Sequence, residues 1–555
     1  MRARALLTAL VAASVLSACA IDAQPSPSSS RTGNEHVINP GAHPLLSLAI
    51  AHGRDLGSVD PSAVMHLTLG LLGRDPAGLD AVLGSGRSLS PQQLAADFGP
   101  DLLAVAPVRA VLSGAGLTSQ WTPGATTLAA QGSAAAASRL FGVAIDNRVG
   151  PDGARFYAPA HAPAVPAALQ PEVDAVTGLD DYPSAAPAGD LITTGGVTPT
   201  QMIDFYDVKP LHDAGLDGSG MTVVFPEIDK YDPDMLDSFA SKFNLPPFDV
   251  SVANDNAGRP SKEQGEADLD LEIVHALAPK AKEVVYYASS DSVLPAEQQM
   301  YRDYPSGAIE SSSVGECEAP DASNRNDATV LGNMQKPAAA SGWSIFVATG
   351  DRGAYDCAPA GDFNDLAADL DASVPYVTAV GGTLVILSSG GGYNREASWG
   401  EPIEQWGGSG GLSQFWQMPS WQQGPGVRNQ FSNGSRETPD VSANADGLSG
   451  WQIYALGGLR VIGGTSAAAP FWAGVAALID QDLKQKGLGA IGFANPALYA
   501  FGQSPSGLPQ PAYHDITVGT NLHYPATANY DLATGLGTPD VAALMADFEW
   551  FKRGH

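Results

Sequence analysis

The sequence of 555 residues contains few cysteines and few basic residues. Its three cysteines, Cys19, Cys317 and Cys357, form no CxxC pair and no Cys/His cluster, so neither a zinc site nor a redox motif is indicated. Only 29 Lys and Arg residues stand against 59 Asp and Glu residues, which gives a formal net charge of -30. This charge repels a phosphate backbone or an anionic membrane surface, so we expect no nucleic-acid partner.

Long apolar runs and internal repeats are missing as well. The apolar run in "MRARALLTALVAASVLSACA" follows Arg2 and Arg4 and is too short to span a bilayer comfortably, which favours an export signal over a membrane anchor. No repeat at solenoid periods is present. With 44% hydrophobic and 16% charged residues, the chain has material for a sizeable core, and its length predicts two domains.

The end of the signal leaves two interpretations open. The stretch "LSAC" (16–19) resembles a bacterial lipobox, in which the cysteine accepts a lipid, while Ala18-Cys19-Ala20 also suits ordinary signal peptidase. We predict a lipoprotein-type signal over 1–18 and a flexible Pro/Ser-rich tether over 19–40. The protein is then exported, to the extracellular space or the cell envelope, and touches a membrane only through lipid on Cys19. In that oxidising compartment Cys317 and Cys357 remain as a pair that we expect to form a disulfide.

A Pro/Gly/Ala-rich segment divides the rest of the chain. Within 41–182, "AVMHLTLGLLG" (63–73) predicts a strand, and "SPQQLAADFG" (90–99) and "APVRAVLSGAGL" (106–117) predict helices, so this part is a small α+β domain. The stretch "YPSAAPAGDLITTGG" (182–196) has little to pack, and we place a protease-accessible linker at 183–198. Beyond it, apolar strands such as "MTVVFPEI" (221–228) and "WSIFVATG" (343–350) alternate with helices, which predicts a parallel sheet covered on both faces.

The stretch "VIGGTSAAAP" (461–470) has the form of a serine nucleophile, Ser466, at the start of a buried helix. Its Gly-Thr-Ser-Ala run is shared with subtilisin-like proteases, whose serine gives its proton to a histidine. Ten histidines are present, but only five lie in the second domain, and none of these five is in the His-Gly-x-His setting that those enzymes use: His212, His275, His514, His523 and His555. His275, in a predicted helix, is the best candidate among them, and a helix-surface or satisfied core histidine is its plainer interpretation.

A base of another kind lies in "GEADLDLEIVHALAP" (265–279), whose apolar residues recur at helical spacing until the proline. Glu266 and Asp270 are four residues apart and share one face, whereas Asp268 points away. Two adjacent carboxyl groups repel when ionised, so one pKa is raised and the pair can hold a proton between them, which suits acid/base chemistry in acid. A solvated acidic helix face is the alternative interpretation.

Together these motifs resemble the sedolisin (serine-carboxyl peptidase) family, whose base lies in Glu-x-x-x-Asp and whose nucleophile lies in Gly-Thr-Ser-Ala-x-x-Pro. The order is similar, with "GEADLDLEIVHALAP" first, "VATGDRGAYDC" (347–357) next and "GGTSAAAP" last. The likeness covers nearly everything after about residue 198, and "HLTLGLLGRDPAGLDAVL" and "FYAPAHAPAVPAAL" resemble the family's prodomain. The resemblance implies a self-processing precursor with an activation prodomain at 41–182 and a subtilisin-like α/β catalytic domain at 199–555.

The resemblance assigns Ser466 as nucleophile, Glu266 as its base, Asp270 as the group that orients Glu266, and Asp351 as the oxyanion-hole donor. A carboxyl group donates a hydrogen bond only while protonated, and a carboxylate base works best near its own pKa. We therefore expect activity centred between about pH 3 and 5. Glu227, at a strand end, is either the family's extra acid that hydrogen-bonds the catalytic glutamate or an ordinary strand-end carboxylate.

Two further stretches carry the resemblance with departures. "IESSSVGECE" (309–318) resembles the substrate-lining strand, but Val314 stands where many relatives have tryptophan, a departure that bears on the specificity pocket. "HDITVG" (514–519) and "ATANYDLATG" (526–535) resemble a site for one calcium ion, and Thr527 and Asn529 replace glycines that are frequent there. The implied ligands are two carboxylates and three main-chain carbonyls, from Asp515, Asp531, Ile516, Thr527 and Asn529.

The resemblance implies protein or peptide substrates, a prodomain that acts as an intramolecular inhibitor, and a monomer. Two alternatives remain open from the sequence. One is a catalytically silent member that keeps the fold for binding, and the other is a histidine-dependent, subtilisin-like serine protease that uses His275.

Overall fold

The structure is a computed structural model that describes residues 46, 49–50, 53–150, 153–161, 163–182, 186–187, 190–192, 196–253, 265–289, 292–320, 322–358, 365–403, 405–504, 508 and 511–554. The expected signal, the tether and lipidated Cys19 lie outside the described residues. Ile38–His555 forms one compact unit. Within the described part of the chain, no helix is both long and apolar enough to cross a membrane.

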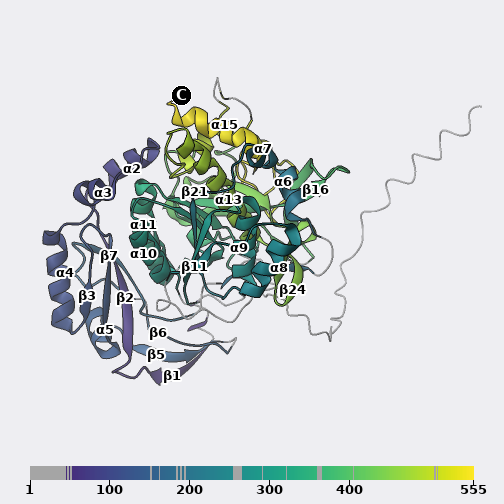
Figure 1. Cartoon of the computed structure of the whole chain (residues 1–555). Helices are drawn as coiled ribbons and strands as arrows, with labels where there is room; N and C mark the ends of the chain where they lie inside the picture. Colours follow the sequence, from purple (N-terminus) through teal and green to yellow (C-terminus); the bar gives the residue numbers. More distant parts are fainter. Residues whose placement is uncertain are drawn as a thin grey trace, which may run out of the picture. The chain divides into compact units, whose positions relative to one another are not determined.

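The first part of the chain combines an antiparallel sheet, in the order β3-β4-β2-β7, with helices that pack on it (Figure 1). Leu67 of the sheet and Val105 of a helix share one core. The strand predicted at 63–73 and the helix predicted at 90–99 are present as β2 and α3, and Ser90 and Gln93 close a capping box on α3. The helix predicted at 106–117 begins earlier, because the Asp101 carboxylate caps it. The elements are β1 (Arg54–Ser58), β2 (Val64–Leu71), α2 (Pro76–Gly84), α3 (Pro91–Asp97), α4 (Leu102–Ala115), β3 (Thr118–Gln120), β4 (Thr127–Ser133), α5 (Ala134–Phe141), β5 (Ile145–Val149), β6 (Arg155–Pro159) and β7 (Val173–Thr177).

The second part is built on a mostly parallel sheet. The strands of this part of the chain, within the main sheet and outside it, are β10 (Thr222–Glu227), β11 (Val250–Val252), β12 (Lys282–Tyr287), β13 (Ile309–Ser312), β14 (Val314–Gly315), β15 (Ser344–Ala348), β16 (Thr378–Leu387), β17 (Tyr393–Ser398), β18 (Gly400–Glu401), β19 (Trp406–Gly407), β20 (Gly411–Gln417), β21 (Ser435–Thr438), β22 (Val441–Asn444), β23 (Trp451–Ala455), β24 (Gly458–Gly463), β25 (Tyr513–His514) and β26 (Thr538–Pro539). The helices are α6 (Pro199–Phe205), α7 (Lys209–Asp213), α8 (Pro233–Phe243), α9 (Glu266–Leu277), α10 (Leu294–Asp303), α11 (Ala322–Ser341), α12 (Leu370–Ser373), α13 (Thr465–Gln485), α14 (Asn495–Gly502) and α15 (Val541–Lys552), with a short 3-10 turn at Gly447–Ser449.

Eight strands of the described chain form the main sheet, in the order β11-β12-β10-β13-β15-β16-β17 with β22 also paired to β16. All of these pairs are parallel except β16 with β17. Helices α9 and α13 belong to one hydrophobic core, and α10 and α11 belong to another. The expected α/β architecture is therefore confirmed. Because the carboxyl ends of parallel strands meet at one edge, Glu227 at the end of β10 and Asp351 after β15 lie at the same edge.

Helices α9 and α13 pack against each other in the middle of this part (Figure 1). Every residue of α9 is buried, so the alternative of a solvated acidic helix face is wrong. The first nineteen residues of α13, Thr465 to Leu483, are buried as well. Gly474 of α13 permits the close approach, because a Cβ there would lie 2.8 Å from Leu277 Cδ1 of α9. The two helices that carry the serine and carboxyl motifs are thus closely packed against each other.

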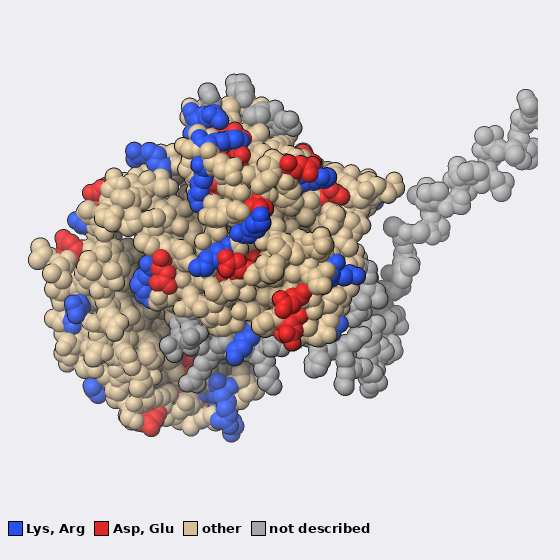
Figure 2. All heavy atoms as spheres, viewed as in Figure 1, with Lys and Arg blue, Asp and Glu red and all other residues tan. Residues whose placement is uncertain are grey.

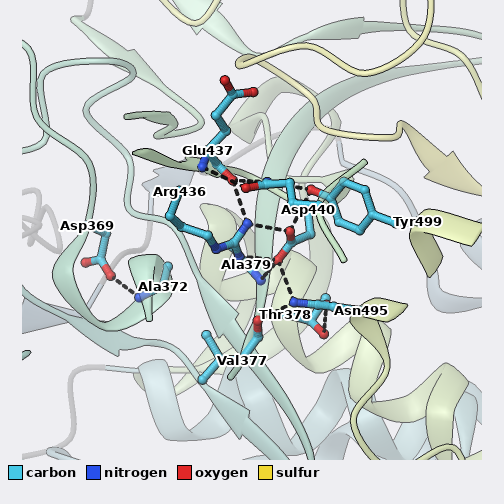
Figure 3. Close-up of polar contacts among 11 residues, drawn as sticks. Asp369, Ala372, Val377, Thr378, Ala379, Arg436, Glu437, Asp440, Asn495 and Tyr499 are labelled. Carbon is cyan, nitrogen blue, oxygen red and sulfur yellow. Dashed lines mark hydrogen bonds and ion pairs between the residues drawn. The ribbon is translucent and has the colours of Figure 1, made fainter. Parts of the chain in front are cut away.

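A buried ion pair holds the segment between β21 and β22. Arg436 and Asp440 are fully buried, with Nη2 of the arginine 2.6 Å from Oδ2 of the aspartate. Figure 3 shows Asp440 at the centre of a network with Tyr499, Ala379 and Asn495. The Tyr499 hydroxyl donates to Oδ1 at 2.8 Å, and the Ala379 N–H donates to Oδ2 at 2.8 Å. The network joins β16, β21 and α14 through charge-assisted hydrogen bonds.

Charged side chains are sparse on the face shown in Figure 2, where basic and acidic residues form scattered spots, several of them side by side, on a largely uncharged surface. Many carboxyl groups lie inside the protein instead, among them Glu227, Glu266, Glu297, Glu310 and Glu396. The net charge of -30 therefore does not measure the surface alone.

Candidate active site

Ser466 is the second residue of α13 and is fully buried, as the sequence predicted for a serine at a helix start. The helix follows Gly464, whose φ of 103° favours glycine. Among the described residues, the Ser466 hydroxyl has no hydrogen-bond partner. A buried hydroxyl without a hydrogen-bond partner costs free energy and is rare in a purely structural core. The position of Ser466 therefore fits a group that contacts a substrate.

Glu266 is the first residue of α9, and its side chain is buried beside Ser466. Burial raises the pKa of Glu266 well above its ordinary value, the Asp270 charge raises it further, and the Ser466 hydroxyl lowers it. The contact between the two side chains falls short of hydrogen-bond geometry, because neither Glu266 oxygen has a hydrogen-bond partner in the described part of the chain. The structure nevertheless brings the predicted nucleophile and the predicted base together.

Asp270 lies one turn further along α9 and is held by Ser313, whose hydroxyl donates to Asp270 Oδ1 at 2.9 Å and approaches the Ser466 carbonyl oxygen at 3.3 Å. Burial raises the pKa of Asp270 well above its ordinary value, and contacts with the Ser313 hydroxyl and with Glu227 lower it. Burial also raises the pKa of Glu227, followed by the Asp270 charge. Glu227 thus meets Asp270, rather than hydrogen-bonding Glu266, and the two carboxyl groups can share a proton.

Asp351 lies in the loop after β15 and is tied to the start of α13. Its Oδ1 accepts the Thr465 N–H at 2.8 Å and the Thr465 hydroxyl at 3.0 Å. The Gly350 N–H donates to the same hydroxyl oxygen at 3.0 Å. The carboxyl group is therefore fixed directly beside the residue that precedes Ser466.

Sequence reasoning missed three residues of this centre. Thr465 fixes Asp351 and Ser313 fixes Asp270, and both lie in stretches that were singled out for other members. Asp229 accepts the first N–H groups of α9. The only sequence feature that could have indicated Asp229 is its position two residues after Glu227, at the end of a predicted strand.

His275 does not serve the serine. It lies nine residues after Glu266, on the opposite side of α9. Its Nε2 is 2.8 Å from the Pro246 carbonyl oxygen, its ring stacks on Phe248, and its Nδ1 lies 3.6 Å from Glu283 Oε1. It is a buried core histidine. Asp268, expected to point away from the pair, does so, because its Oδ1 accepts the Asp232 N–H at 2.7 Å.

The expected disulfide is present, with Cys317 and Cys357 joined and their Cα atoms 4.9 Å apart. Cys317 follows β14 and Cys357 follows the Asp351 loop, so the bond connects the two segments beside the serine. Val314, the departure in the substrate-lining stretch, is buried in the core that contains α10 and α11.

Two short strands of the predicted linker pair beside Ser466. β8 (Ala186–Pro187) runs antiparallel to β14, with Pro187 opposite Val314. β9 (Asp190–Ile192) runs antiparallel to β24, with Asp190 opposite Gly463. Val314 follows Ser313, which contacts Ser466, and Gly463 precedes Ser466 by three residues. Both linker strands therefore pair with segments that adjoin Ser466.

The residues expected to bind calcium come together near the C-terminus. Both Asp515 oxygens accept the Asn529 N–H at 3.0 Å, and Asp531 Oδ2 accepts the Thr527 N–H at 2.6 Å. Asn529 has φ 66°, the conformation in which glycine is frequent, and the Ile516 side chain is buried. Burial raises the pKa of Asp531 to about 6.

The donor set of this loop fits a hard cation. Its carboxylates keep lone pairs beyond the bonds that they accept, and the expected carbonyls would add neutral oxygens. Among the described residues no group of three or more His, Cys, Asp or Glu could hold a metal ion, so a calcium site here depends on the main-chain carbonyls.

The fold and the matches to known families define the class of protein. Residues 51–182 match the family "Pro-kumamolisin, activation domain", and residues 252–491 match the "Subtilase family". The protein is a serine-type peptidase of the subtilase fold with an N-terminal activation domain.

Individual relatives narrow this class. Kumamolisin of Bacillus sp. (strain MN-32) is 32% identical over 485 residues, which cover 81% of this chain and 84% of kumamolisin. Sedolisin of Pseudomonas sp. (strain 101) is 28% identical over 565 residues, which cover 93% and 90% of the two chains. The solved structure of Pseudomonas sedolisin, a serine-carboxyl proteinase, complexed with two molecules of pseudo-iodotyrostatin, matches 65% of this chain and 99% of its own, with a TM-score of 0.56 and 28% identity. The chain belongs to the sedolisin family of serine-carboxyl peptidases.

Proposed function

We propose that this protein is an exported, acid-acting serine-carboxyl peptidase that cleaves its own linker. The observation that carries the proposal is the pairing of the linker with the two segments that adjoin Ser466, through β8 with β14 and β9 with β24. Antiparallel addition of an extended segment to a free strand is a common way to bind a peptide. The linker then lies as a substrate does, and the processed bond falls between Pro187 and Asp190.

The proposed chemistry uses four side chains. The Ser466 hydroxyl oxygen attacks the carbonyl carbon of the scissile bond, and its proton passes to Glu266. Glu266 returns the proton to the leaving amine as the C–N bond breaks, and water then hydrolyses the acyl ester in the same way. Asp351, while protonated, donates a hydrogen bond to the oxyanion. Asp270 and Glu227 share a proton, and their charge influences whether Glu266 is protonated.

This division of roles explains why acid is the expected medium. Burial raises the pKa of Glu266, and its neighbours Asp270 and Asp351 raise it further. Protons are then held within the carboxyl centre in mild acid and lost toward neutrality, where an ionised Asp351 would repel the oxyanion. The expected range of about pH 3 to 5 is where ordinary carboxyl groups titrate, and the raised pKa of Glu266 favours the upper end of that range.

The prodomain contacts the catalytic part through α11. Lys336 Nζ lies 2.6 Å from Asp80 Oδ1, and Asn333 Nδ2 donates to Asp174 Oδ1 at 2.9 Å. The Thr126 hydroxyl donates to the Asn333 carbonyl oxygen. With the linker paired to β14 and β24, these contacts support a role for the prodomain as an intramolecular inhibitor, and processing would release the catalytic chain from it. If Cys19 carries lipid, the prodomain stays at the membrane and the catalytic chain leaves.

One calcium ion is proposed in the loop of Asp515 and Asp531, with carbonyl ligation from Ile516, Thr527 and Asn529. The ion would supply positive charge to a buried carboxylate, Asp531, and hold two segments of the C-terminal region together. It takes no part in the reaction steps above.

The test is to incubate the purified precursor at pH 4 and pH 7.5 and to follow chain length by intact mass. Cleavage at pH 4 between Pro187 and Asp190, lost in Ser466→Ala and in Glu266→Ala, is the expected result. Asp268→Asn is the matched control, because it changes a buried carboxyl group on the same helix that bonds Asp232 instead of the serine. It should process like the unmodified chain.

Other outcomes count against the proposal. A chain that stays intact at both pH values indicates a silent family member or one that a second protease activates. Processing only at pH 7.5 contradicts the carboxyl mechanism. Lipid found on the processed catalytic chain contradicts release from a membrane-held prodomain.

A further inference from the structure

The turn after β10 holds a carboxylate with no role in the mechanism above. Asp229 is fully buried and follows Glu227 by two residues. Its Oδ2 accepts the N–H groups of Gly265 at 3.1 Å and of Glu266 at 3.3 Å, and its Oδ1 accepts that of Ala267 at 3.0 Å. One carboxylate from a distant segment thus binds the start of α9.

Helix α9 depends on this outside partner because its N-cap residue, Gly265, has no side chain to accept a hydrogen bond. The first N–H groups of a helix find no acceptor within the helix, and here they are buried. A negative group is also favoured at the positive end of the helix dipole. Glu266 is the first residue of α9 and its own N–H is one of the three, so Asp229 helps set the direction in which the Glu266 side chain leaves the helix.

Asp229 also acts on the centre through its charge. Burial is the largest influence on Glu227, Glu266 and Asp270, and the Asp229 charge adds to it by raising the pKa of each. Two further ionisable groups respond to this centre. Burial raises the pKa of Tyr287, at the end of β12, and the charges of Tyr231, Glu227 and Asp229 raise it further. The charge of Asp351, in the loop after β15, raises the pKa of Glu266.

We infer that Asp229 is a positioning residue of the Ser466 centre, which holds the first turn of α9 and keeps a negative charge beside Glu266. The inference rests on the proposed function. An ordinary helix cap would contribute stability alone, whereas Asp229 also sets the pH range in which Glu266 exchanges its proton.

The experiment compares the pH dependence of kcat/KM for acid-processed enzymes on an internally quenched peptide with the sequence of residues 182–196. Asp229→Asn keeps the shape and one acceptor but removes the charge, so both limbs of the pH profile should move to lower pH, by about one unit. Asp229→Glu keeps the charge but displaces the cap, so kcat should fall with the profile in place. Asp540→Asn is the matched control, since Asp540 caps α15 by accepting the Ala543 N–H at 3.0 Å. Its profile should not move.

An unshifted profile in Asp229→Asn overturns the inference and leaves an ordinary cap. If that variant shows no cooperative melting transition, Asp229→Glu decides: a lower kcat at an unchanged pH optimum supports positioning, and an unchanged kcat overturns it. A Ser466→Ala enzyme that cleaves the peptide at the unmodified rate would instead overturn the proposed function itself.

Discussion

Replacement of Asp351 by asparagine separates hydrogen-bond donation from the charge of the carboxyl group. Thr465 occupies Asp351 Oδ1 with two donors, at 2.8 and 3.0 Å. An asparagine can keep its carbonyl oxygen in that position and place its NH2 group where the aspartate has Oδ2. The amide donates a hydrogen bond at every pH, whereas the carboxyl group donates only while protonated.

The expected fall in kcat follows from what one hydrogen-bond donor to the oxyanion contributes to catalysis. Loss of such a donor costs about 2.7 to 4 kcal/mol, a fall of roughly a hundred- to a thousandfold in kcat. Asp351→Ala should show this fall at pH 4. Asp351→Asn should lose much less there, and its activity relative to the unmodified enzyme should rise as the pH is increased toward neutrality.

The assay is kcat/KM between pH 3 and 7 on the linker peptide, with melting temperatures to verify folding. Two results would refute the reasoning. One is an alanine variant with unchanged kcat, and the other is an asparagine variant whose activity relative to the unmodified enzyme stays constant across the range. Thr465→Val is an informative further variant, because it removes one of the two donors that orient Asp351. It should lower kcat both in the unmodified enzyme and in Asp351→Asn.

Three further predictions concern stability and are best measured in the Ser466→Ala chain, which should not cut itself. Burial raises the pKa of Glu310 to about 8 and of Glu396 to about 7, so the stability that these groups contribute is complete below about pH 4 and is lost as the pH rises through 7 to 8. The melting temperature should therefore fall between pH 5 and pH 8, and it should fall less in Glu310→Gln. A melting temperature that rises over this range would contradict the prediction. Asp440→Ala leaves Arg436 buried without its carboxylate and should cost about 3 to 5 kcal/mol in chemical denaturation. Asp213→Ala, at the exposed Lys209 pair, should leave the denaturation curve nearly unchanged. Chelation of calcium should lower the melting temperature, and Asp515→Asn should reduce that response, whereas identical melting with and without chelator would argue against the ion.

Much of the catalytic part could be predicted from local patterns. The spacing of Glu266 and Asp270 places them on one helix face, and the structure has that helix at Glu266–Leu277. The position of Ser466 at a helix start and the alternation of strands and helices follow from equally short-range signals. The burial of the acidic face was not visible in the spacing, because a charged helix face is usually solvated.

By itself, the sequence determined which residue types stand at which spacing, and so the family, the α/β architecture and the serine and carboxyl motifs. Only the tertiary structure decided which of them meet: Glu227 contacts Asp270, Thr465 fixes Asp351, and Asp229 caps α9. It also paired the linker strands with the two segments that adjoin the serine. Helical and strand periodicity acts over a few residues, whereas these contacts join segments tens to hundreds of residues apart and arise only when packing brings the strand ends and helix starts to one edge.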